Sequence, residues 1–537
     1  MVGKPTLLVI SKEFKIEKLL NKTEIYNILY NRHKGEFLTL KELPYPNTFK
    51  DMTRAVKRVA EAIKTGEKIA LIGDYDVDGV TATTVMRELF EQIGYPLQWV
   101  IPNRFTDGYG VSKTVLDRVD ASVVMTVDNG IAAVEPARIC KERGIDLIIT
   151  DHHALPPTLP DAYAIVDQKQ PDCKFKFKEV CGAQIAWYFA AALGKELGVS
   201  VDTKSLMAIV SLAIVADIMP LTGINRVMLI AGLEYLKRSD KAFIKALKRR
   251  NMLKNLNSET VAFYLAPLIN SAGRLKDASI ASDFLFTKSE SEAEMILDEL
   301  ISLNTERKAI ERAITKDALK QVNPSDKIAI VWGREWNEGV VGIVASKVAE
   351  HYKIPAIVLS CKDGICKGSG RNWGDCDLFS LVGEAREYLD KFGGHKAAVG
   401  LSFKEEKMPL IKSLLNIKAS EQCSKDFTDK TILGTLPFSE IDFELLEIME
   451  KFEPYGEANT KPKFITKGVE ILEVNEVGAT KEHKRYRLKD GNRVFTAIEF
   501  RSKSIAQKGD LCDIIYTISK NEYNDNVYIN LYIEEIR

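Results

Sequence analysis

Short apolar runs that end in acidic residues recur in the first third of the chain. Apolar residues at helical spacing cover residues 53–65 and 81–92, and between them residues 68–72 predict a short buried strand. An acidic run follows that strand, namely Asp74, Asp76 and Asp78. The pattern therefore indicates a strand that delivers carboxylates at its carboxyl end.

The same strand-to-acid unit occurs twice more. Residues 122–127 and residues 146–150 each predict a buried strand that runs into polar residues. The acidic and imidazole residues at these two strand ends are Asp128, Asp151, His152 and His153. Because parallel strands end at one edge of their sheet, the three units predict an open, mainly parallel α/β sheet with a site along that edge.

The middle of the chain predicts helices and then a second α/β unit. Helical patterns dominate residues 183–286, and residues 292–322 form one charged amphipathic pattern without Gly or Pro. We expect the latter to be a long helix that joins two domains. Further signals are strands at 327–331 and 356–360, a helix at 342–351 and a Gly-rich loop at 392–400.

The last hundred residues have a different pattern. Runs rich in β-forming residues at 494–500, 512–518 and 527–533 alternate with polar turns, which is typical of a small β-barrel. The predicted fold class is therefore α/β, with two α/β domains joined by a long helix and followed by a β-barrel. The expected boundaries are 1–47 for an N-terminal segment, 48–290 for the first domain, 291–323 for the helix, 324–426 for the second domain and 427–537 for the barrel.

Length and composition agree with several folded domains. The chain has 537 residues, of which 45% are hydrophobic and 28% charged. Lys plus Arg and Asp plus Glu are both 75, so the net charge is zero and any binding of a polyanion must depend on local patches. No apolar run is long enough to span a membrane, and we expect a cytoplasmic protein without a membrane partner.

The eight cysteines show no Cys-x-x-Cys pair and no Cys/His spacing typical of a metal site. Cys361, Cys366 and Cys376 come nearest to a cluster. For an unexported chain, we expect reduced thiols throughout.

Acidic crowding at the strand ends is the most informative chemical feature. Carboxylates gathered this closely repel one another and lose hydration unless cations neutralise them. Oxygen ligands with one imidazole favour Mn²⁺ or Mg²⁺ over zinc. A calcium loop is disfavoured, because the later Glu of an EF-hand is missing and a strand precedes the run. Two ions about 3.5–4 Å apart, bridged by one aspartate, would form a hydrolytic site for phosphate esters.

These motifs resemble a known family. The runs at 74–79, 128–130, 151–153 and 216–217 resemble, in order and spacing, the four motifs of the DHH phosphoesterases. Phe392-Gly393-Gly394-His395 is similar to the GGH motif of the DHH-associated domain, and the barrel is similar to an OB-fold. Within that superfamily, the chain resembles the RecJ single-strand-specific exonucleases from about residue 25 to its end.

The resemblance implies a set of metal ligands, namely Asp74, Asp76, Asp78, Asp128, His152 and Asp217. Asp76 and Asp78 would each hold one of two Mn²⁺ or Mg²⁺ ions, with Asp128 bridging both. Asp74 would support the first ion, and the remaining two ligands would complete the second. A water shared by the ions would attack phosphorus in line.

The resemblance also implies catalytic residues around those ions. His153 would face the scissile phosphate, and His395 would stabilise the charge that builds on it. Asp151 would orient the ring of His152 without itself binding an ion.

A third set of residues would bind the end of a nucleic-acid strand. The family's phosphate-binding positions correspond to Arg104, Arg274, Ser369 and Arg371, and Asn270 is a further substrate-binding position. Guanidinium groups and a hydroxyl suit a terminal phosphate, so the resemblance implies 5′→3′ polarity and nucleoside 5′-monophosphate products. Three positions depart from the family pattern, Leu268, Asn337 and Asn372, and they put substrate contacts and rate in question.

Basic residues gather in two further stretches. Residues 481–508 contain nine Lys or Arg against three acids, a local net charge of +6, with Tyr486 and Phe495 between them. Basic grooves with aromatic platforms hold single strands on OB-folds, so we expect Tyr486 and Arg487 to bind substrate. Residues 237–254 carry eight Lys or Arg against Asp240, and contact with a nucleic-acid backbone is the role considered for them.

The sequence therefore predicts a monomeric, metal-dependent 5′→3′ exonuclease of single-stranded DNA, acting in repair and recombination. A single-strand-binding protein and a helicase are the partners that the resemblance suggests. Two alternatives remain open. One is a DHH phosphodiesterase of short oligonucleotides or cyclic dinucleotides, and the other is a non-catalytic single-strand-binding scaffold.

Overall fold

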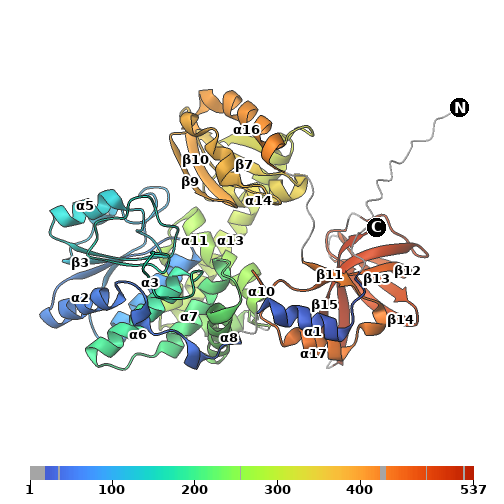
Figure 1. The fold of residues 1–537 in the computed structure, drawn as a ribbon, viewed down its shortest axis with the longest axis horizontal. Helices are drawn as coiled ribbons and strands as arrows, with labels where there is room; N and C mark the ends of the chain where they lie inside the picture. The colour runs from blue at the N-terminus through green and yellow to red at the C-terminus, as the bar shows by residue number, and fades with distance from the viewer. Residues whose placement is uncertain are drawn as a thin grey trace. The chain divides into compact units, whose positions relative to one another are not determined.

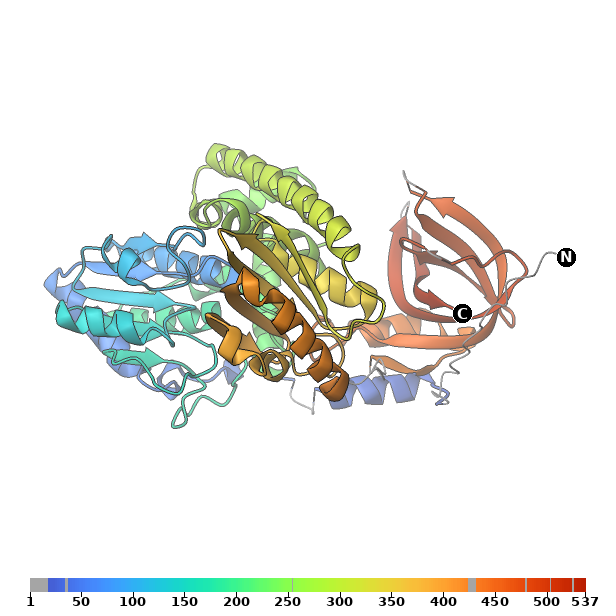
Figure 2. The same ribbon diagram turned by 90° about the horizontal axis from the view of Figure 1, so that it is seen from above.

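The computed structural model describes residues 18–33, 37–253, 255–423, 431–478, 481–502, 504–523 and 526–537 (Figures 1 and 2). The chain divides into two compact units, which are described one after the other. The larger contains residues 38–220 and 224–428, and the smaller contains the described residues before 38, residues 221–223 and the described residues after 428. No helix among the described residues has both the length and the apolar character of a membrane span.

A five-stranded parallel sheet forms the first domain of the larger unit. Its strands are β1 (Ile69–Ile72), β2 (Gln98–Val100), β3 (Val123–Val127), β4 (Asp146–Thr150) and β5 (Ala164–Val166). Their order is β2-β1-β3-β4-β5, and every neighbouring pair is parallel. The predicted open sheet is confirmed, with the three acidic strand ends on adjacent strands β1, β3 and β4.

Helices cover both faces of this sheet, as parallel sheets require because their strands are apolar on both sides. On one face lie α4 (Lys113–Leu116) and α5 (Val134–Glu142), and on the other α2 (Met52–Thr65), α3 (Val77–Gln92) and α6 (Gly182–Leu197). Helix α3 begins four residues earlier than its predicted start at residue 81. The carboxylate of Asp76 caps it by accepting the backbone N–H groups of Asp78 and Gly79, so part of the acidic run is helical.

Helices follow up to the second domain. They are α7 (Thr203–Ala216), α8 (Gly223–Arg238), α9 (Ala242–Arg249), α10 (Ser258–Thr260), a π-helical turn (Val261–Leu265), α11 (Ala266–Leu275), α12 (Ser279–Phe286) and α13 (Glu290–Leu319). The predicted long helix is confirmed by the 30 residues of α13, which Figure 2 shows as one continuous helix. It packs on α9, α11 and α12 of the first domain and on α14 (Val341–Tyr352) of the second.

The second α/β domain is a mixed five-stranded sheet. Its other elements are β6 (Ala329–Arg334), β7 (Ala356–Lys362), β8 (Ile365–Arg371), α15 (Leu378–Gly383), β9 (Lys391–His395), β10 (Ala398–Lys404) and α16 (Met408–Gln422). The order is β6-β7-β8-β10-β9, with only β6 and β7 parallel. Ile357 and Leu359 of β7 face the core with α16, while Ala356 and Val358 face α14.

The glycine-rich segment 392–400 is a β-hairpin and not the loop that the sequence predicted. Strand β9 pairs with β10, so that Gly394 lies opposite Val399. Gly394 has a φ of +142°, and a Cβ there would lie 2.3 Å from the carbonyl oxygen of Ala398. The glycine thus permits close strand pairing, which is why a glycine-rich sequence is compatible with a strand here.

The prediction that all cysteines are reduced is wrong for this domain. Disulfides join Cys361 to Cys366 and Cys376 to Cys423. Pairing of β7 with β8 sets the first two cysteines directly opposite each other, and the second pair is 47 residues apart in sequence, so only the folded chain brings it together. The remaining cysteines are free and buried, namely Cys140, Cys173, Cys181 and Cys512.

The smaller unit is the predicted barrel. Its elements are α1 (Lys22–Arg32), β11 (Ile432–Thr435), α17 (Phe443–Glu450), β12 (Lys463–Val477), β13 (His483–Asp490), β14 (Arg493–Glu499), β15 (Leu511–Tyr523) and β16 (Asn526–Ile536). The sheet order is β11-β12-β13-β14-β16-β15, and pairing of β12 with β15 closes it, which confirms a barrel.

The described residues of the N-terminal segment up to Phe37 belong with the barrel, whereas residues 38–47 belong to the larger unit. Leu19 pairs with Thr435 of β11, and α1 packs against α17. The expected boundary between 426 and 427 lies outside the described residues. Single 3₁₀ turns complete the described elements, at Leu40–Glu42, Pro46–Thr48, Arg386–Tyr388, Glu405–Lys407 and Phe438–Glu440.

Candidate metal centre and nucleic-acid interface

The predicted metal ligands meet at the carboxyl edge of the parallel sheet. Asp74, Asp76 and Asp78 follow β1, Asp128 follows β3, His152 follows β4 and Asp217 ends α7. They form two groups whose ligand atoms lie within 4.8 Å of one another, one of Asp74, Asp76 and Asp128 and one of Asp78, His152 and Asp217. Asp128 and His152 also form such a group with His153.

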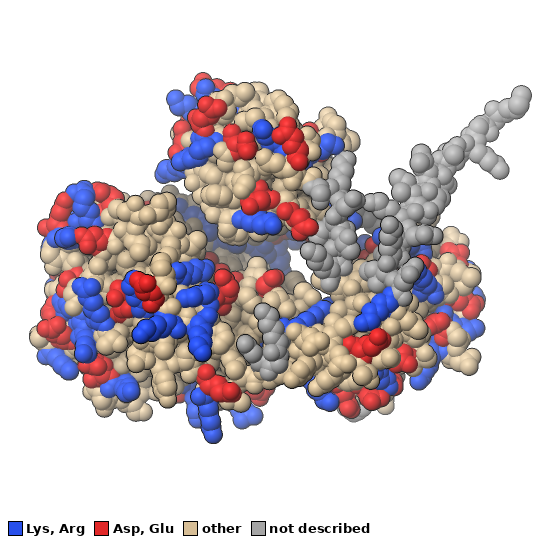
Figure 3. All heavy atoms as spheres, viewed as in Figure 1, with Lys and Arg blue, Asp and Glu red and all other residues tan. Residues whose placement is uncertain are grey.

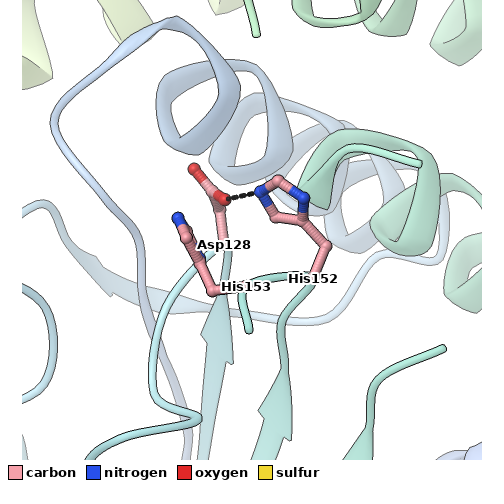
Figure 4. A group of neighbouring side chains, drawn as sticks. All are labelled: Asp128, His152 and His153. Carbon is pink, nitrogen blue, oxygen red and sulfur yellow. Dashed lines mark ion pairs between the residues drawn. The ribbon is translucent and has the colours of Figure 1, made fainter. Parts of the chain in front are cut away.

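His152 connects these groups. Its Nε2 atom lies 3.1 Å from Oδ1 of Asp128, 3.5 Å from Oδ2 of Asp78 and 3.6 Å from Oδ2 of Asp217. Figure 4 shows the ring of His152 and the carboxylate of Asp128 pointing toward each other from adjacent strand ends. Asp128 therefore lies between the two groups, as a bridging ligand must.

Burial and mutual repulsion make the acids costly to ionise without cations. Burial first, and then the charges of neighbouring aspartates, raise the pKa of Asp74 and Asp128 well above the ordinary value. The same causes raise the pKa of Asp217 to about 9. Oδ1 of Asp74 and Oδ2 of Asp217 are buried and accept no hydrogen bond from the described part of the chain. Buried oxygen atoms without partners, with one imidazole among them, fit Mn²⁺ or Mg²⁺.

Backbone packing fixes where the carboxylates point. Asp78 accepts hydrogen bonds from the N–H groups of Gly182 and Ala183, at 2.6 and 2.8 Å. A Cβ at Gly182 would lie 2.6 Å from Cβ of Asp128, so glycine is needed for that approach. Asp128 itself has a φ of 61°, a left-handed conformation that aspartate tolerates better than most residues.

Neutral imidazole at position 152 suits a metal ligand. Burial lowers the pKa of His152 and outweighs the nearby carboxylate of Asp78, which acts in the opposite direction. A nitrogen atom without a proton therefore stays available to an ion at neutral pH.

Asp151 orients His153 and not the ring of His152, which corrects the sequence-based assignment. Oδ1 of Asp151 lies 2.7 Å from Nδ1 of His153, and Oδ2 accepts the backbone N–H of Ile131 at 2.8 Å. The ring of His152 points away, toward the other carboxylates. Burial disfavours charge on His153, but the hydrogen bond to Asp151 prevails and raises the pKa of His153 to about 9.

The predicted phosphate-binding arginines lie close enough to repel one another. Burial first, and then the charge of Arg104, lower the pKa of Arg274 to about 10, and Arg371 acts in the same direction. The guanidinium of Arg104 stacks over the ring of Tyr75, 4.2 Å from its centroid. Nε of Arg104 is buried and donates no hydrogen bond within the described ranges. Guanidinium groups crowded in this way favour an anion between them.

Ser369 and Arg371 lie beside the first turn of α14. Nη1 of Arg371 donates to Oγ of Ser369 at 2.6 Å. A Cβ at Gly342 would lie 3.0 Å from Nη2 of Arg371 and 3.3 Å from that Oγ, so glycine keeps this space open.

We call Arg104, Arg274, Ser369 and Arg371 the arginine pocket. Two glycines bring it close to the acidic loop after β1. A Cβ at Gly273 would lie 2.4 Å from the carbonyl oxygen of Tyr75, and one at Gly339 would lie 2.2 Å from that of Arg274. Nη1 of Arg274 also donates to the carbonyl oxygen of Gly339 at 2.8 Å. The acidic loop, α11 and the second domain are therefore in direct backbone contact.

His395 is exposed at the end of β9. Burial of its ring, and then the charges of Arg371, His153 and Lys169, lower the pKa of His395. Its ring is therefore within electrostatic reach of both the arginine pocket and the metal centre.

The sequence analysis assigned no role to two residues of this region. Lys169 follows β5, and its charge reaches His152, Asp217 and His395. The ring of Tyr109 lies edge-on to that of His153, with centroids 6.4 Å apart. Lys169 could have been found from the sequence, because it closely follows a strand of the same sheet.

The remaining predicted positions near the pocket have different environments. Asn270 lies half-buried on α11, one turn before Arg274. Leu268 is buried in the core, while Oδ1 of Asn337 accepts the N–H of Gly339 at 2.9 Å and supports its close approach. The backbone N–H of Asn372 donates to the carbonyl oxygen of Ala397.

Tyr486 cannot stack on a base, so its predicted role is wrong. Its ring is fully buried, and its hydroxyl donates to Oε2 of Glu499 at 2.7 Å. Alternation along β13 turns Tyr486 and Leu488 inward, whereas Arg487 is exposed. Phe495 also packs against the core.

Another aromatic group is exposed on the barrel. Phe500 is 60% exposed, stacks on Tyr532 with ring centroids 5.7 Å apart, and meets His483 edge-on at 5.3 Å. Arg485 and Arg487 are exposed on the same side of β13 as His483. We call these five residues the outer barrel face. Lys503, counted in the basic stretch, lies outside the described residues.

In the folded chain, basic residues of the other stretch, residues 237–254, form ion pairs with acidic residues. Acids of α13 pair with Lys245, Arg249 and Arg250 of α9 and its end, namely Glu290, Glu294 and Asp298. The role considered for residues 237–254 therefore has no support, and Lys254 lies outside the described residues. Figure 3 shows Lys and Arg interspersed with Asp and Glu over the face in view.

Three family models match the chain. The DHH family N-terminal domain matches residues 68–214, the DHHA1 domain matches residues 325–421 and the RecJ OB domain matches residues 433–535.

Curated relatives are all similar to most of this chain. It is 34% identical to the single-stranded-DNA-specific exonuclease RecJ of Bacillus subtilis over 93% of this chain and 65% of that protein. It is 31% identical to RecJ of Escherichia coli over 76% of this chain and 77% of that protein. It is 29% identical to RecJ of Haemophilus influenzae, with coverage of 93% and 92%.

Solved structures are similar too. RecJ from Thermus thermophilus in complex with Mn²⁺ matches with a TM-score of 0.81 and 25% identity, over 97% of this chain and 79% of that one. An exonuclease RecJ bound to manganese matches with a TM-score of 0.61 and 30% identity, over 70% of this chain and 95% of that one.

Proposed function

This chain belongs to the RecJ family of single-stranded-DNA-specific exonucleases, and from that premise we propose that it hydrolyses single-stranded DNA from the 5′ end and releases nucleoside 5′-monophosphates. The observation that carries the proposal is the juxtaposition of an acidic centre with a pocket of mutually repelling arginines. The first attracts divalent cations, and the second attracts the terminal phosphate of a strand.

Each ligand group would hold one Mn²⁺ or Mg²⁺ ion. Asp74 and Asp76 would hold the first and Asp78, His152 and Asp217 the second, with Asp128 shared between them. When bound, the ions supply Lewis-acid activation of water and neutralise charge on the phosphate. The side chains would fix the separation of the two ions and the net charge of the site.

His153 and His395 would act on the phosphate. With its pKa raised to about 9, His153 is protonated at neutral pH and can donate a hydrogen bond to a phosphate oxygen. Asp151 holds that ring in place. His395 belongs to the second domain and would stabilise the same charge from the other side, where its lowered pKa keeps it neutral.

The arginine pocket would set polarity. A 5′-phosphate held by Arg104, Arg274 and Arg371, with Ser369 beside them, fixes which phosphodiester reaches the ions. Cleavage would then proceed from the 5′ end, one nucleotide at a time.

The outer barrel face would bind the strand. Phe500 offers an exposed ring on which a base can stack, and Arg485 and Arg487 offer charge to the backbone. Replacing Phe500 with alanine should weaken binding of a 30-nucleotide strand about ten-fold, since base stacking is worth ~1–3 kcal/mol. Tyr486→Phe is the matched control and should leave binding within two-fold, because Tyr486 is buried. Fluorescence anisotropy in chelator measures both.

The wider assignments rest on the family resemblance alone. We propose a cytoplasmic monomer that acts in DNA repair and recombination, with a single-strand-binding protein and a helicase as partners. Co-purification of those proteins with the tagged chain would test the partners, and light scattering would test the monomer.

One assay tests the function directly. Single-stranded oligonucleotides with a 5′-phosphate or a 5′-hydroxyl, labelled at either end, are incubated with Mn²⁺ or chelator. We expect metal-dependent shortening from the 5′ end, faster with the phosphate, and mononucleotide products. Digestion of dinucleotides but not of long strands would favour the short-oligonucleotide alternative, and binding without digestion would favour the scaffold.

A further inference from the structure

Helix α7 ends in a turn that usually requires glycine. The N–H of Met219 donates to the carbonyl oxygen of Ile214 at 3.1 Å, and the N–H of Ile218 donates to that of Val215 at 3.2 Å. These two hydrogen bonds define a Schellman motif, in which the residue at the position of Ile218 takes a left-handed conformation. Ile218 has a φ of 54°, and a β-branched residue there is strained, because its Cβ substituents crowd the backbone.

Burial of the Ile218 side chain does not offset the free energy cost of this strain. The side chain of Ile218 is 68% exposed, whereas the following Met219 is buried. An exposed isoleucine adds little to the hydrophobic core, and glycine or asparagine would fit the turn better. Strained residues of this kind gather at functional sites, where contact with a ligand gives the side chain a role that the fold does not.

Ile218 directly follows a member of the metal centre. Oδ2 of Asp217 lies 3.6 Å from Nε2 of His152, and adjacent Cα atoms are about 3.8 Å apart. A phosphodiester held at the group of Asp78, His152 and Asp217 would bring its sugars and bases within reach of this rim.

We propose that Ile218 contacts the substrate, packing its aliphatic side chain against the sugar or base next to the scissile phosphate. The inference rests on the function proposed above and adds a substrate-binding residue to it. The contact is apolar, so it would tolerate any base. Ile218 takes no part in the chemistry, so it should affect substrate binding and not the chemical step.

Substitutions that relieve the strain test the proposal in the full-length protein. In Ile218→Gly and Ile218→Asn the apolar contact is lost, and KM for a 5′-phosphorylated strand should rise about ten-fold with kcat within two-fold. Ile218→Val keeps the apolar contact and should keep KM within two-fold. Thermal unfolding in chelator should show that Ile218→Gly raises Tm by about 2 °C.

Lys353 provides the matched control. It also has a left-handed φ, of 56°, at the end of α14, and its side chain is exposed outside the site. Lys353→Gly should raise Tm as Ile218→Gly does, and leave KM unchanged.

Two results would overturn the inference. The first is an unchanged KM in both the glycine and the asparagine variants, which would mean that no substrate touches the side chain. The second is weaker Mn²⁺ binding by calorimetry with unchanged KM, which would mean that Ile218 only positions Asp217. If the wild type digests no DNA, the proposed function fails, and strand binding in chelator by wild type and Ile218→Gly still decides whether Ile218 makes the contact.

Discussion

The acidic centre and the arginine pocket both crowd like charges, but they are built differently. Three adjacent strands of one sheet deliver most of the acids, and backbone N–H groups hold the carboxylate of Asp78 in place. The arginines come from three separate elements. Arg104 follows β2, Arg274 lies on α11, and Arg371 lies on β8 of the second domain.

We expect this difference to separate hydrolysis from the choice of strand end. The acidic centre is complete within the first domain, so its geometry does not depend on how the second domain packs. The arginine pocket combines residues of both domains, which meet where Gly339 contacts Arg274. Damage to the centre should therefore abolish hydrolysis, whereas damage to the pocket should change which strand end is accepted.

The largest effect is expected from Asp128→Asn. Asparagine tolerates the left-handed φ of 61° and keeps the shape of the side chain, but it removes the shared charge. We expect kcat to fall by at least ~1,000-fold, because two-metal hydrolysis requires both ions. In chelator, Tm should rise, because burial and repulsion raise the pKa of Asp128. Single-turnover digestion and thermal unfolding measure the two effects, and a variant that still digests DNA would contradict the bridging role.

A smaller and selective effect is expected from Arg371→Lys. Lysine keeps the charge but loses the planar fork, so KM for a 5′-phosphorylated strand should rise about twenty-fold. For a 5′-hydroxyl strand KM should change less than two-fold. An equal loss on both substrates would show that Arg371 supports the fold or the backbone path and not the terminal phosphate.

Gly339→Ala tests the contact that assembles the pocket. A Cβ there would lie 2.2 Å from the carbonyl oxygen of Arg274, so the second domain must shift. We expect preference for the 5′-phosphate to fall about five-fold, at a stability cost of ~1–3 kcal/mol, while Mn²⁺ affinity stays within two-fold. Gly383→Ala is a control, because a Cβ there has no neighbour within 4 Å. Loss of Mn²⁺ affinity would contradict an independent metal centre.

The smallest effect concerns pH in the absence of metal. The pKa of Asp217 is about 9 in the folded chain against 3.8 ordinarily. The folded chain therefore binds a proton that the unfolded chain has lost, and stability decreases as pH rises from about 4 to about 9. His153, raised to about 9, adds to the decrease above pH 6.5.

The arginines should not contribute to that slope. The pKa of Arg274 is about 10, so the group stays charged below pH 9. We expect Tm in chelator to fall by a few degrees between pH 7 and pH 9, and Asp217→Asn to reduce the fall. Saturating Mn²⁺ should flatten the curve, because the ions replace the protons. A chelator curve as flat as the Mn²⁺ curve would contradict the raised pKa values.

Local patterns predicted much of the molecule. Apolar runs before Asp74, Asp128 and Asp151 predicted three strands of one mainly parallel sheet, because strand ends with acids have a short-range signature. The long helix and the barrel were also predicted. The hairpin at Gly394 was not, because glycine permits both a loop and a tight strand pair, and only its partner strand decides between them.

Side-chain direction was the main source of error. Tyr486 and Arg487 are neighbours in a basic stretch, but alternation along β13 buries one and exposes the other. Asp151 lies next to His152, yet its carboxylate holds the ring of His153. Pairing of Cys361 with Cys366 likewise depends on strand register.

The amino-acid sequence alone determined the fold class, the acids that reach one sheet edge, and the family. These depend on spacing along the chain, which hydrophobic periodicity and short motifs record directly. Only the tertiary structure decided which carboxylates lie together in one group, where the arginines converge, and that Ile218 is left strained and exposed next to Asp217. Those features depend on distances between segments far apart in the chain, and packing alone sets such distances.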